Sequence, residues 1–133
     1  MTDAQPADVV LADTSGLIAI EPERVRAGPP PARLAVAAVT IGELRLGVLA
    51  ANDSTTRARR LATLSRSEAL EPLPIAAHVA DASAALRIAL RDAGRRMPVN
   101  DSWIAATAIA HRMPAVSQDA DDDAVPGLGA IRV

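Results

Sequence analysis

The stretch "VVLADTSGLIAI", residues 9–20, decides which fold the chain can adopt. It begins with an apolar run, reaches Asp13, continues through Thr14, Ser15 and Gly16, and then becomes apolar again. A short run without polar residues is typical of a strand that is buried on both faces in a parallel sheet. The polar residues that follow predict where that strand ends and a helix begins.

The rest of the chain alternates between short apolar runs and longer segments with helical spacing. Strands are expected at 9–13, 34–39, 114–117 and near the C-terminus at 129–133, and helices at 40–51, 52–70, 75–93 and 100–112, with one or two helical turns after residue 15. Such alternation predicts an α/β fold with three layers, in which helices flank both faces of a short central parallel sheet. A length of 133 residues suits one domain, residues 1–133.

Composition narrows the classes of protein further. The chain has no Cys, which excludes disulfides and thiolate zinc sites. Its longest apolar run, Leu34 to Gly42, is far shorter than the roughly 20 residues of a membrane span, and its first residues are acidic, unlike a signal peptide. We therefore expect a cytoplasmic protein that is not inserted in a membrane.

Acidic residues occur at each expected joint between a strand and a helix, and the carboxyl ends of parallel strands meet at one edge of the sheet. They are Asp13 after the first strand, Glu43 in the helix after the second, Asp101 where the helix at 100–112 begins, and Asp119 and Asp121 after the third strand. Helical spacing places Asp101 in line with Ile104 and Glu43 in line with Leu46, so both acids are expected to face the core.

Each acid also has a simpler interpretation. Asp13 and Asp101 are residue types that cap helices, because their oxygens accept hydrogen bonds from the free amides of a first turn. The sequence "TIGE" from Thr40 to Glu43 has the spacing of a capping box, and "DADDD" at 119–123 is typical of a solvated turn. Taken one at a time, these interpretations stay open.

The charge of the whole set favours a metal site. Two carboxylates about 4 Å apart repel by roughly 4 kcal/mol at an effective dielectric constant near 20. The chain has no Lys, and no Arg adjoins these joints, so a bound cation is the best source of the compensating charge. Oxygen ligands, with only two His in the chain, favour Mg²⁺ or Mn²⁺, which assist the hydrolysis of phosphodiesters.

Four segments together resemble the PIN-domain ribonucleases, specifically the VapC-type toxins of bacterial type II toxin–antitoxin systems. These segments are "LADTSGLIAI", "TIGELRLG", "NDSWIAATAIA" and "AVSQDADDDAVPGL", which lie between residues 9 and 128. The resemblance implies a PIN-like fold and an Mg²⁺-dependent endoribonuclease (Mn²⁺ can replace the Mg²⁺) that cuts cellular RNA such as tRNA or rRNA. It also implies a homodimer, a VapB-type antitoxin that neutralises the enzyme, and binding of promoter DNA only as the toxin–antitoxin complex.

The resemblance also assigns roles to individual residues. Asp13, Glu43 and Asp101 would bind metal, with Asp119 or Asp121 as the fourth acid; Asp119 is favoured because it lies nearer the strand end. Ser15 and Ser117 would lie beside the ions, and Thr40 and Asn100 would support the metal ligands. The family usually has an aromatic residue where this chain has Asp122, which leaves the choice between Asp119 and Asp121 open.

Arginines supply candidate contacts to RNA. Arg57 and Arg60 occur in the helix expected at 52–70, and Arg91 and Arg95 follow i, i+4 spacing at the end of the helix expected at 75–93. Guanidinium groups suit bidentate contacts with phosphate, although a solvated helix face is the simpler interpretation of each cluster. A different class of function is also compatible with the acids: a non-catalytic PIN-like module whose acidic cleft docks a basic partner protein.

Overall fold

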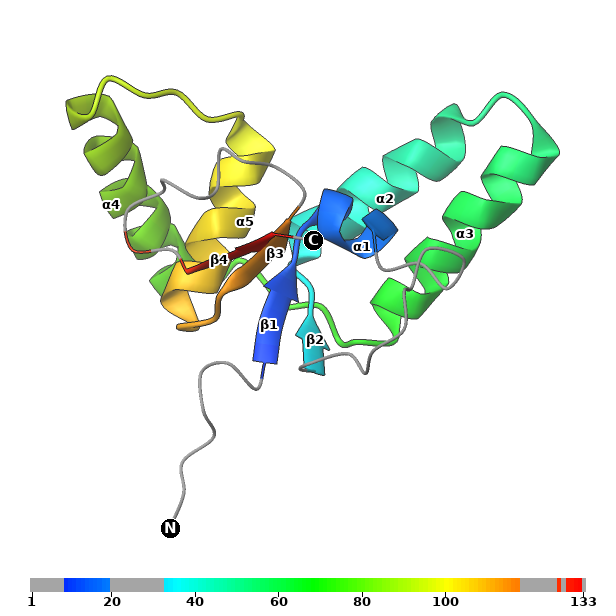
Figure 1. Ribbon diagram of the computed structural model, residues 1–133, viewed down its shortest axis with the longest axis horizontal. Coiled ribbons are helices and arrows are strands. Elements are labelled where there is room, and N and C mark those ends of the chain that lie inside the picture. Colours follow the sequence, from blue (N-terminus) through cyan, green and yellow to red (C-terminus); the bar gives the residue numbers. More distant parts are fainter. Residues whose placement is uncertain (1–8, 20–32, 118–126, 128, 133) are drawn as a thin grey trace, which may run out of the picture.

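A computed structural model describes residues 9–19, 33–117, 127 and 129–132. The strands are β1 (Val9–Ala12), β2 (Arg33–Ala35), β3 (Ala115–Ser117) and β4 (Ala130–Arg132), and the helices are α1 (Thr14–Ala19), α2 (Ala38–Ala50), α3 (Ser54–Glu68), α4 (Ala77–Asp92) and α5 (Val99–Ala110). The strands form one sheet in the order β2-β1-β3-β4, and every pairing is parallel (Figure 1). The predicted parallel sheet and the alternation of strands and helices are confirmed.

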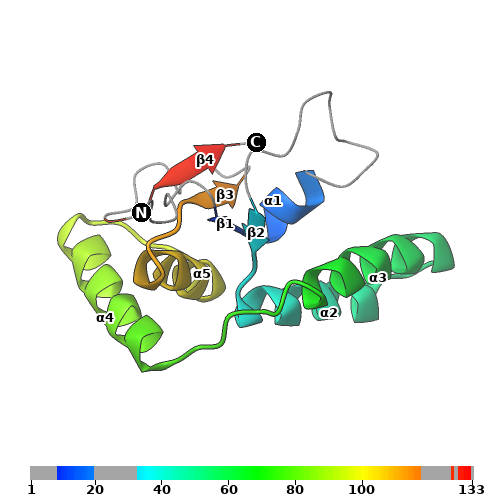
Figure 2. The same ribbon diagram turned by 90° about the horizontal axis from the view of Figure 1, so that it is seen from below.

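Helices cover both faces of this sheet, as the sequence predicts. Successive residues of a strand point to opposite faces. Ala12 belongs to a buried cluster with Leu17 of α1 and with residues of α2 and α3, whereas Leu11 belongs to a second cluster that includes Ile104 of α5. Figure 2 shows α1 on one side of the strands and α5 on the other. The three-layer arrangement therefore depends on β1, which is buried on both faces.

The second strand is shorter than its apolar run predicts. A strand is expected at 34–39, but β2 ends at Ala35 and α2 already begins at Ala38. Between them Ala37 forms an isolated parallel bridge with Leu73, closed by hydrogen bonds of 2.8 Å from Leu73 N to the carbonyl of Val36 and from Ala38 N to the carbonyl of Leu73. A short apolar run does not distinguish a strand from the start of a buried helix, and that ambiguity explains the error.

Two helical hairpins diverge from the sheet (Figure 1). In the first, Asp53 caps α3 by accepting hydrogen bonds from the backbone amide and hydroxyl of Thr56, at 2.7 and 2.9 Å. Arg57 and Arg60 of α3 donate to the carbonyls of Ala51 and Gly47 at the end of α2, at 2.8 and 2.7 Å. These bonds hold α3 against α2, so two of the four arginines that the sequence offers as RNA contacts have a structural role in this fold.

The second hairpin pairs α4 with α5. Leu86 and Leu90 of α4 pack on Ala105 of α5 near one end. At the other end the rings of His78 and His111 meet edge to face, with their centroids 4.9 Å apart. Nε2 of His111 is buried and has no hydrogen-bond partner among the residues described. No helix in the described part of the chain is both long and apolar enough to cross a membrane.

The environment of His111 predicts a loss of stability in mild acid. Burial, and secondarily the charge of His78, lower the pKa of His111 from its usual 6.5. Below about pH 6.5 the unfolded chain therefore binds this proton more readily than the folded chain, and the free energy of unfolding falls as the pH drops. We expect the melting temperature to fall between about pH 7.5 and pH 5.5, and to fall less in His111→Gln.

His78→Gln serves as the comparison, because it removes only the smaller of the two causes that lower the pKa of His111, the charge of His78. It should reduce the pH dependence less than His111→Gln does. Melting curves of His111→Gln that keep the full pH dependence of the parent protein would contradict this interpretation.

Candidate active site

Asp13 lies immediately after β1, where the chain turns into α1. Its Oδ1 accepts hydrogen bonds from the backbone amide of Gly16 at 2.7 Å and from the hydroxyl of Ser15 at 2.9 Å, and its carbonyl accepts from the amide of Leu17 at 2.9 Å. The capping interpretation of Asp13 is therefore correct. These bonds also fix the direction of a half-buried carboxylate at the carboxyl edge of the sheet.

Glu43 is joined to the same edge through Thr14, the residue that follows Asp13. The hydroxyl of Thr14 donates to Oε1 of Glu43 at 2.8 Å, although the two residues are 29 positions apart in the chain. The start of α1 therefore contributes Asp13 directly and positions Glu43 of α2 through one hydrogen bond.

The capping-box interpretation of "TIGE" is wrong. The N-cap residue of α2 is Ala37, which makes no side-chain hydrogen bond, and Thr40 lies within the helix, fully buried. Since α2 begins three residues earlier than the motif would require, Thr40 cannot cap it. The only described partner of the Glu43 side chain is Thr14.

The expectation that Glu43 faces the core along the line of Leu46 is also wrong. Leu46 is 66% exposed, and the buried side of α2 is formed by Thr40, Leu44 and Val48. Glu43 lies beside this buried side and is half-buried. Its position at the carboxyl edge therefore follows from the contact between α1 and α2 rather than from the apolar stripe of its own helix.

The surroundings of Asp13 and Glu43 suit a cation. Neither carboxylate forms a salt bridge with any residue that the structure describes. The hydrogen bonds above engage Oδ1 of Asp13 and Oε1 of Glu43, so each group keeps a second oxygen that can coordinate. A pair of carboxylates held by hydroxyl and amide donors is a donor set for a hard divalent cation such as Mg²⁺ or Mn²⁺.

Asp101 lies in the first turn of α5 and is half-buried. The N-cap residue of α5 is Pro98 and makes no side-chain hydrogen bond, so Asp101 is inside the helix rather than at its cap. Ile104, Ala105 and Ala108, which share its helical face, are buried as expected. Its helix packs against α2, which carries Glu43.

The structure brings together only part of the expected ligand set. Within residues 9–19 and 33–117, no group of three Asp, Glu or His side chains is placed to hold a metal ion. Asp119 and Asp121 lie outside the described residues, as does the side chain of Ser117 at the end of β3. The four-acid set is therefore a prediction, of which the structure shows that Asp13 and Glu43 are both hydrogen-bonded to residues at the start of α1.

The residues that were expected to support the metal ligands also lie only partly at the candidate site. Ser15 donates a hydrogen bond to Asp13, and its expected place beside an ion stays a prediction. Thr40 is fully buried, and its hydroxyl has no described partner. Asn100 is exposed on the first turn of α5, next to Asp101. Thr14 has no role in the site predicted from the sequence, although its place directly after Asp13 in "ADTSG" was a usable signal.

Comparisons with known proteins show which family the chain resembles. A family model described as PIN domain matches residues 10–128. Ribonuclease VapC4 of Mycobacterium tuberculosis is 46% identical over 128 residues, which cover 92% of this chain and 95% of the relative. Ribonuclease VapC5 of the same organism is 43% identical over 129 residues, covering 96% of this chain and 95% of the relative.

Solved structures show the same similarity. A member of the VapBC family of toxin-antitoxin systems, VapBC-5 from Mycobacterium tuberculosis, matches with a TM-score of 0.82 and 41% identity over 95% of this chain and 99% of that one. VapBC2 from Rickettsia felis, bound to a promoter DNA fragment, shares the fold with a TM-score of 0.76 at 18% identity, over 93% of this chain and 98% of that one. The chain belongs to the PIN-domain family, among its VapC-type members.

Proposed function

We propose that this protein is a metal-dependent endoribonuclease of the VapC type, which uses Mg²⁺, or Mn²⁺ in its place. The observation that carries the proposal is the Asp13–Glu43 pair, held at the carboxyl edge of the sheet with no cationic partner in the described part of the chain. Ribonucleases with a PIN domain are generally dependent on divalent metal ions. The names of the relatives supply the substrate class, RNA.

The residues of this chain have distinct tasks in the proposed reaction. Asp13 and Glu43 bind the ion, and Asp101 completes the site together with Asp119 or Asp121. A divalent ion, when bound, lowers the pKa of a coordinated water and stabilises the charge that develops on the phosphate. Ser15 and Gly16 hold Asp13, and Thr14 holds Glu43, so that the ligands are in place before the ion binds.

We also propose a protein partner, a small VapB-type antitoxin, with promoter DNA bound by the complex and the toxin forming a homodimer in the cytoplasm. Support comes from the relatives solved as toxin-antitoxin systems. On this chain, Leu46 and Leu49 of α2 are 66% and 72% exposed, and Leu61 of α3 is 44% exposed. An exposed apolar surface of this kind is typical of one that a protein covers.

Cleavage of RNA tests the function. The purified protein should cleave labelled tRNA or rRNA with Mg²⁺ and lose the activity in EDTA. Asp13→Asn and Asp101→Asn should each lower the rate by at least about 100-fold, because changes to residues that merely support metal ligands already cost about 10- to 100-fold. Both variants should remain folded by circular dichroism.

Asp81→Asn is the matched control, since Asp81 is exposed on α4. Its rate should equal that of the parent protein. Cleavage that persists in EDTA or in Asp13→Asn would contradict the proposal and would favour a non-catalytic module that docks a basic partner.

The contact between Thr14 and Glu43 gives a sharper prediction. Thr14→Val keeps the size of the side chain and removes the hydroxyl that binds Oε1 of Glu43. The rate at low Mg²⁺ should fall by about 10- to 100-fold and recover partly at high Mg²⁺, because a supporting hydrogen bond sets the affinity of a metal ligand. Thr14→Ser, which keeps the hydroxyl, should retain most of the activity.

Thr55→Val on the exposed side of α3 is the control for the loss of a hydroxyl. A Thr14→Val enzyme with the same dependence on Mg²⁺ as the Thr55→Val enzyme would show that Thr14 does not position Glu43.

A further inference from the structure

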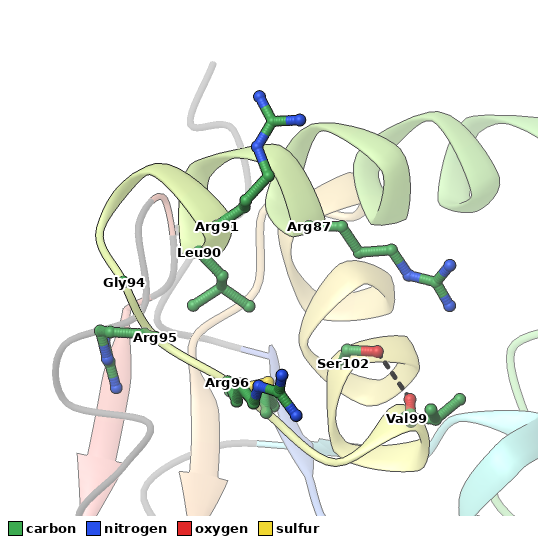
Figure 3. Close-up of a pocket in the computed structure, with 9 residues that line it drawn as sticks. Arg87, Leu90, Arg91, Gly94, Arg95, Arg96, Val99 and Ser102 are labelled. Atoms are coloured by element: carbon green, nitrogen blue, oxygen red, sulfur yellow. Dashed lines mark hydrogen bonds between the residues drawn. The ribbon is translucent and has the colours of Figure 1, made fainter.

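A pocket of about 580 Å³ lies between the end of α4 and the beginning of α5 (Figure 3). Four arginines line it, Arg87, Arg91, Arg95 and Arg96, together with Leu90, Met97 and the first turn of α5. Its volume falls within the range of about 300–1,000 Å³ that is usual for ligand sites. We call this feature the arginine pocket.

The positive charge of the arginine pocket favours the binding of an anion. No carboxylate is among the described residues that line it. Arg91 pairs with its neighbour Asp92 at 3.3 Å, but both side chains are mostly exposed, and such pairs contribute little. Arg87 lies over the ring of Trp103, 5.8 Å from its centre. Arg87 and Arg96 form no salt bridge with any residue that the structure describes, so a phosphate bound between them would supply the opposite charge.

The arginine pocket has a charged part, formed by guanidinium groups, and an apolar part, formed by Leu90 and Met97. Figure 3 shows Arg87 and Arg96 directed toward the side where Ser102 and the first turn of α5 lie, whereas Arg95 points to the opposite side and Arg91 points outward. Leu90 is buried and Met97 is half-buried, which gives the pocket an apolar floor. A nucleotide has both matching parts, because its phosphate can bind the guanidinium groups and its ribose or base can lie on the floor.

The arginine pocket adjoins the candidate active site. Val99 and Ser102, which line the pocket, flank Asp101 on the first turn of α5. The first turn of α5 thus both lines the arginine pocket and carries Asp101, a proposed metal ligand. We propose that the arginine pocket holds a nucleotide of the RNA strand next to the bond that is cut, with its phosphate between Arg87 and Arg96; this inference rests on the proposed ribonuclease function.

Binding without cleavage tests the proposal. The probe is a short fluorescein-labelled RNA of mixed sequence, and its anisotropy is followed in EDTA over a series of salt concentrations. Arg87→Gln/Arg96→Gln should raise the Kd at least about tenfold, since hydrogen bonds to charged groups each contribute that much. The slope of log K against log salt should shrink by about 0.7, because the contact with one phosphate of a single strand is lost.

Arg59→Gln/Arg112→Gln is the matched control. Both arginines are exposed, Arg59 on α3 and Arg112 beyond the far end of α5, and the variant loses the same charge. Its Kd should change less than twofold. An equal loss in the two double variants, or no loss in Arg87→Gln/Arg96→Gln, would overturn the proposal. If that variant melts early, Arg96→Glu alone, which leaves Arg87 on Trp103, should still weaken binding more than Arg112→Glu.

Two further probes distinguish other anions. Poly-glutamate or a DNA duplex that binds more tightly than RNA and depends on Arg87 and Arg96 would assign the pocket to a protein segment or to DNA, and would overturn the RNA assignment. Cleavage with Mg²⁺ is measured separately. A loss of RNA binding in Arg87→Gln/Arg96→Gln, in a protein that never cleaves RNA, would support the arginine pocket and refute only the nuclease function.

Discussion

The hydrogen bond from Thr14 to Glu43 is the constraint on which the candidate site depends. It joins Thr14, the first residue of α1, to the second turn of α2 and so brings two carboxylates from distant parts of the chain to one edge of the sheet. The same turn holds Asp13 through the amide of Gly16 and the hydroxyl of Ser15. Bringing two anions together is unfavourable unless a cation joins them, and no described residue supplies one. This arrangement is what supports the proposed site for a divalent ion.

The sequence predicted the fold well because its signals were strong and local. A strand buried on both faces, as β1 is with Leu11 and Ala12 fully buried, has no polar residues to interrupt its apolar run. Gly94, with a positive φ of 67°, and Pro98 marked the gap between α4 and α5 correctly. The errors came where two local patterns compete: the apolar run at 34–39 contained the start of α2, and "TIGE" had the letters of a capping box inside a helix that had already begun.

The candidate site was less predictable because it depends on contacts between elements. Helical spacing alone placed Glu43 on the face of Leu46, which is exposed, whereas the contact of α1 with α2 decides where Glu43 lies. Thr14 was missed for the same reason, since its partner is 29 residues away. Likewise, four arginines that look alike in sequence have different surroundings: Arg57 and Arg60 bind backbone carbonyls of α2, and Arg91 and Arg95 line the arginine pocket. The net charge of the chain is only −2, but the acidic residues lie at the carboxyl edge of the sheet and basic residues gather in the arginine pocket. This separation of charge suits an enzyme that binds a polyanion.

Direct measurement of metal binding is the strongest test of this account. Mn²⁺ is titrated into the metal-free protein, and the free ion is followed by electron paramagnetic resonance, so that neither RNA nor cleavage is required. If Asp13 and Glu43 share the ion, then Asp13→Asn and Glu43→Gln should each weaken binding by at least about tenfold, whereas Asp81→Asn should leave it unchanged. Mn²⁺ affinity that is the same in the parent protein and in both of the first two variants would contradict the central claim.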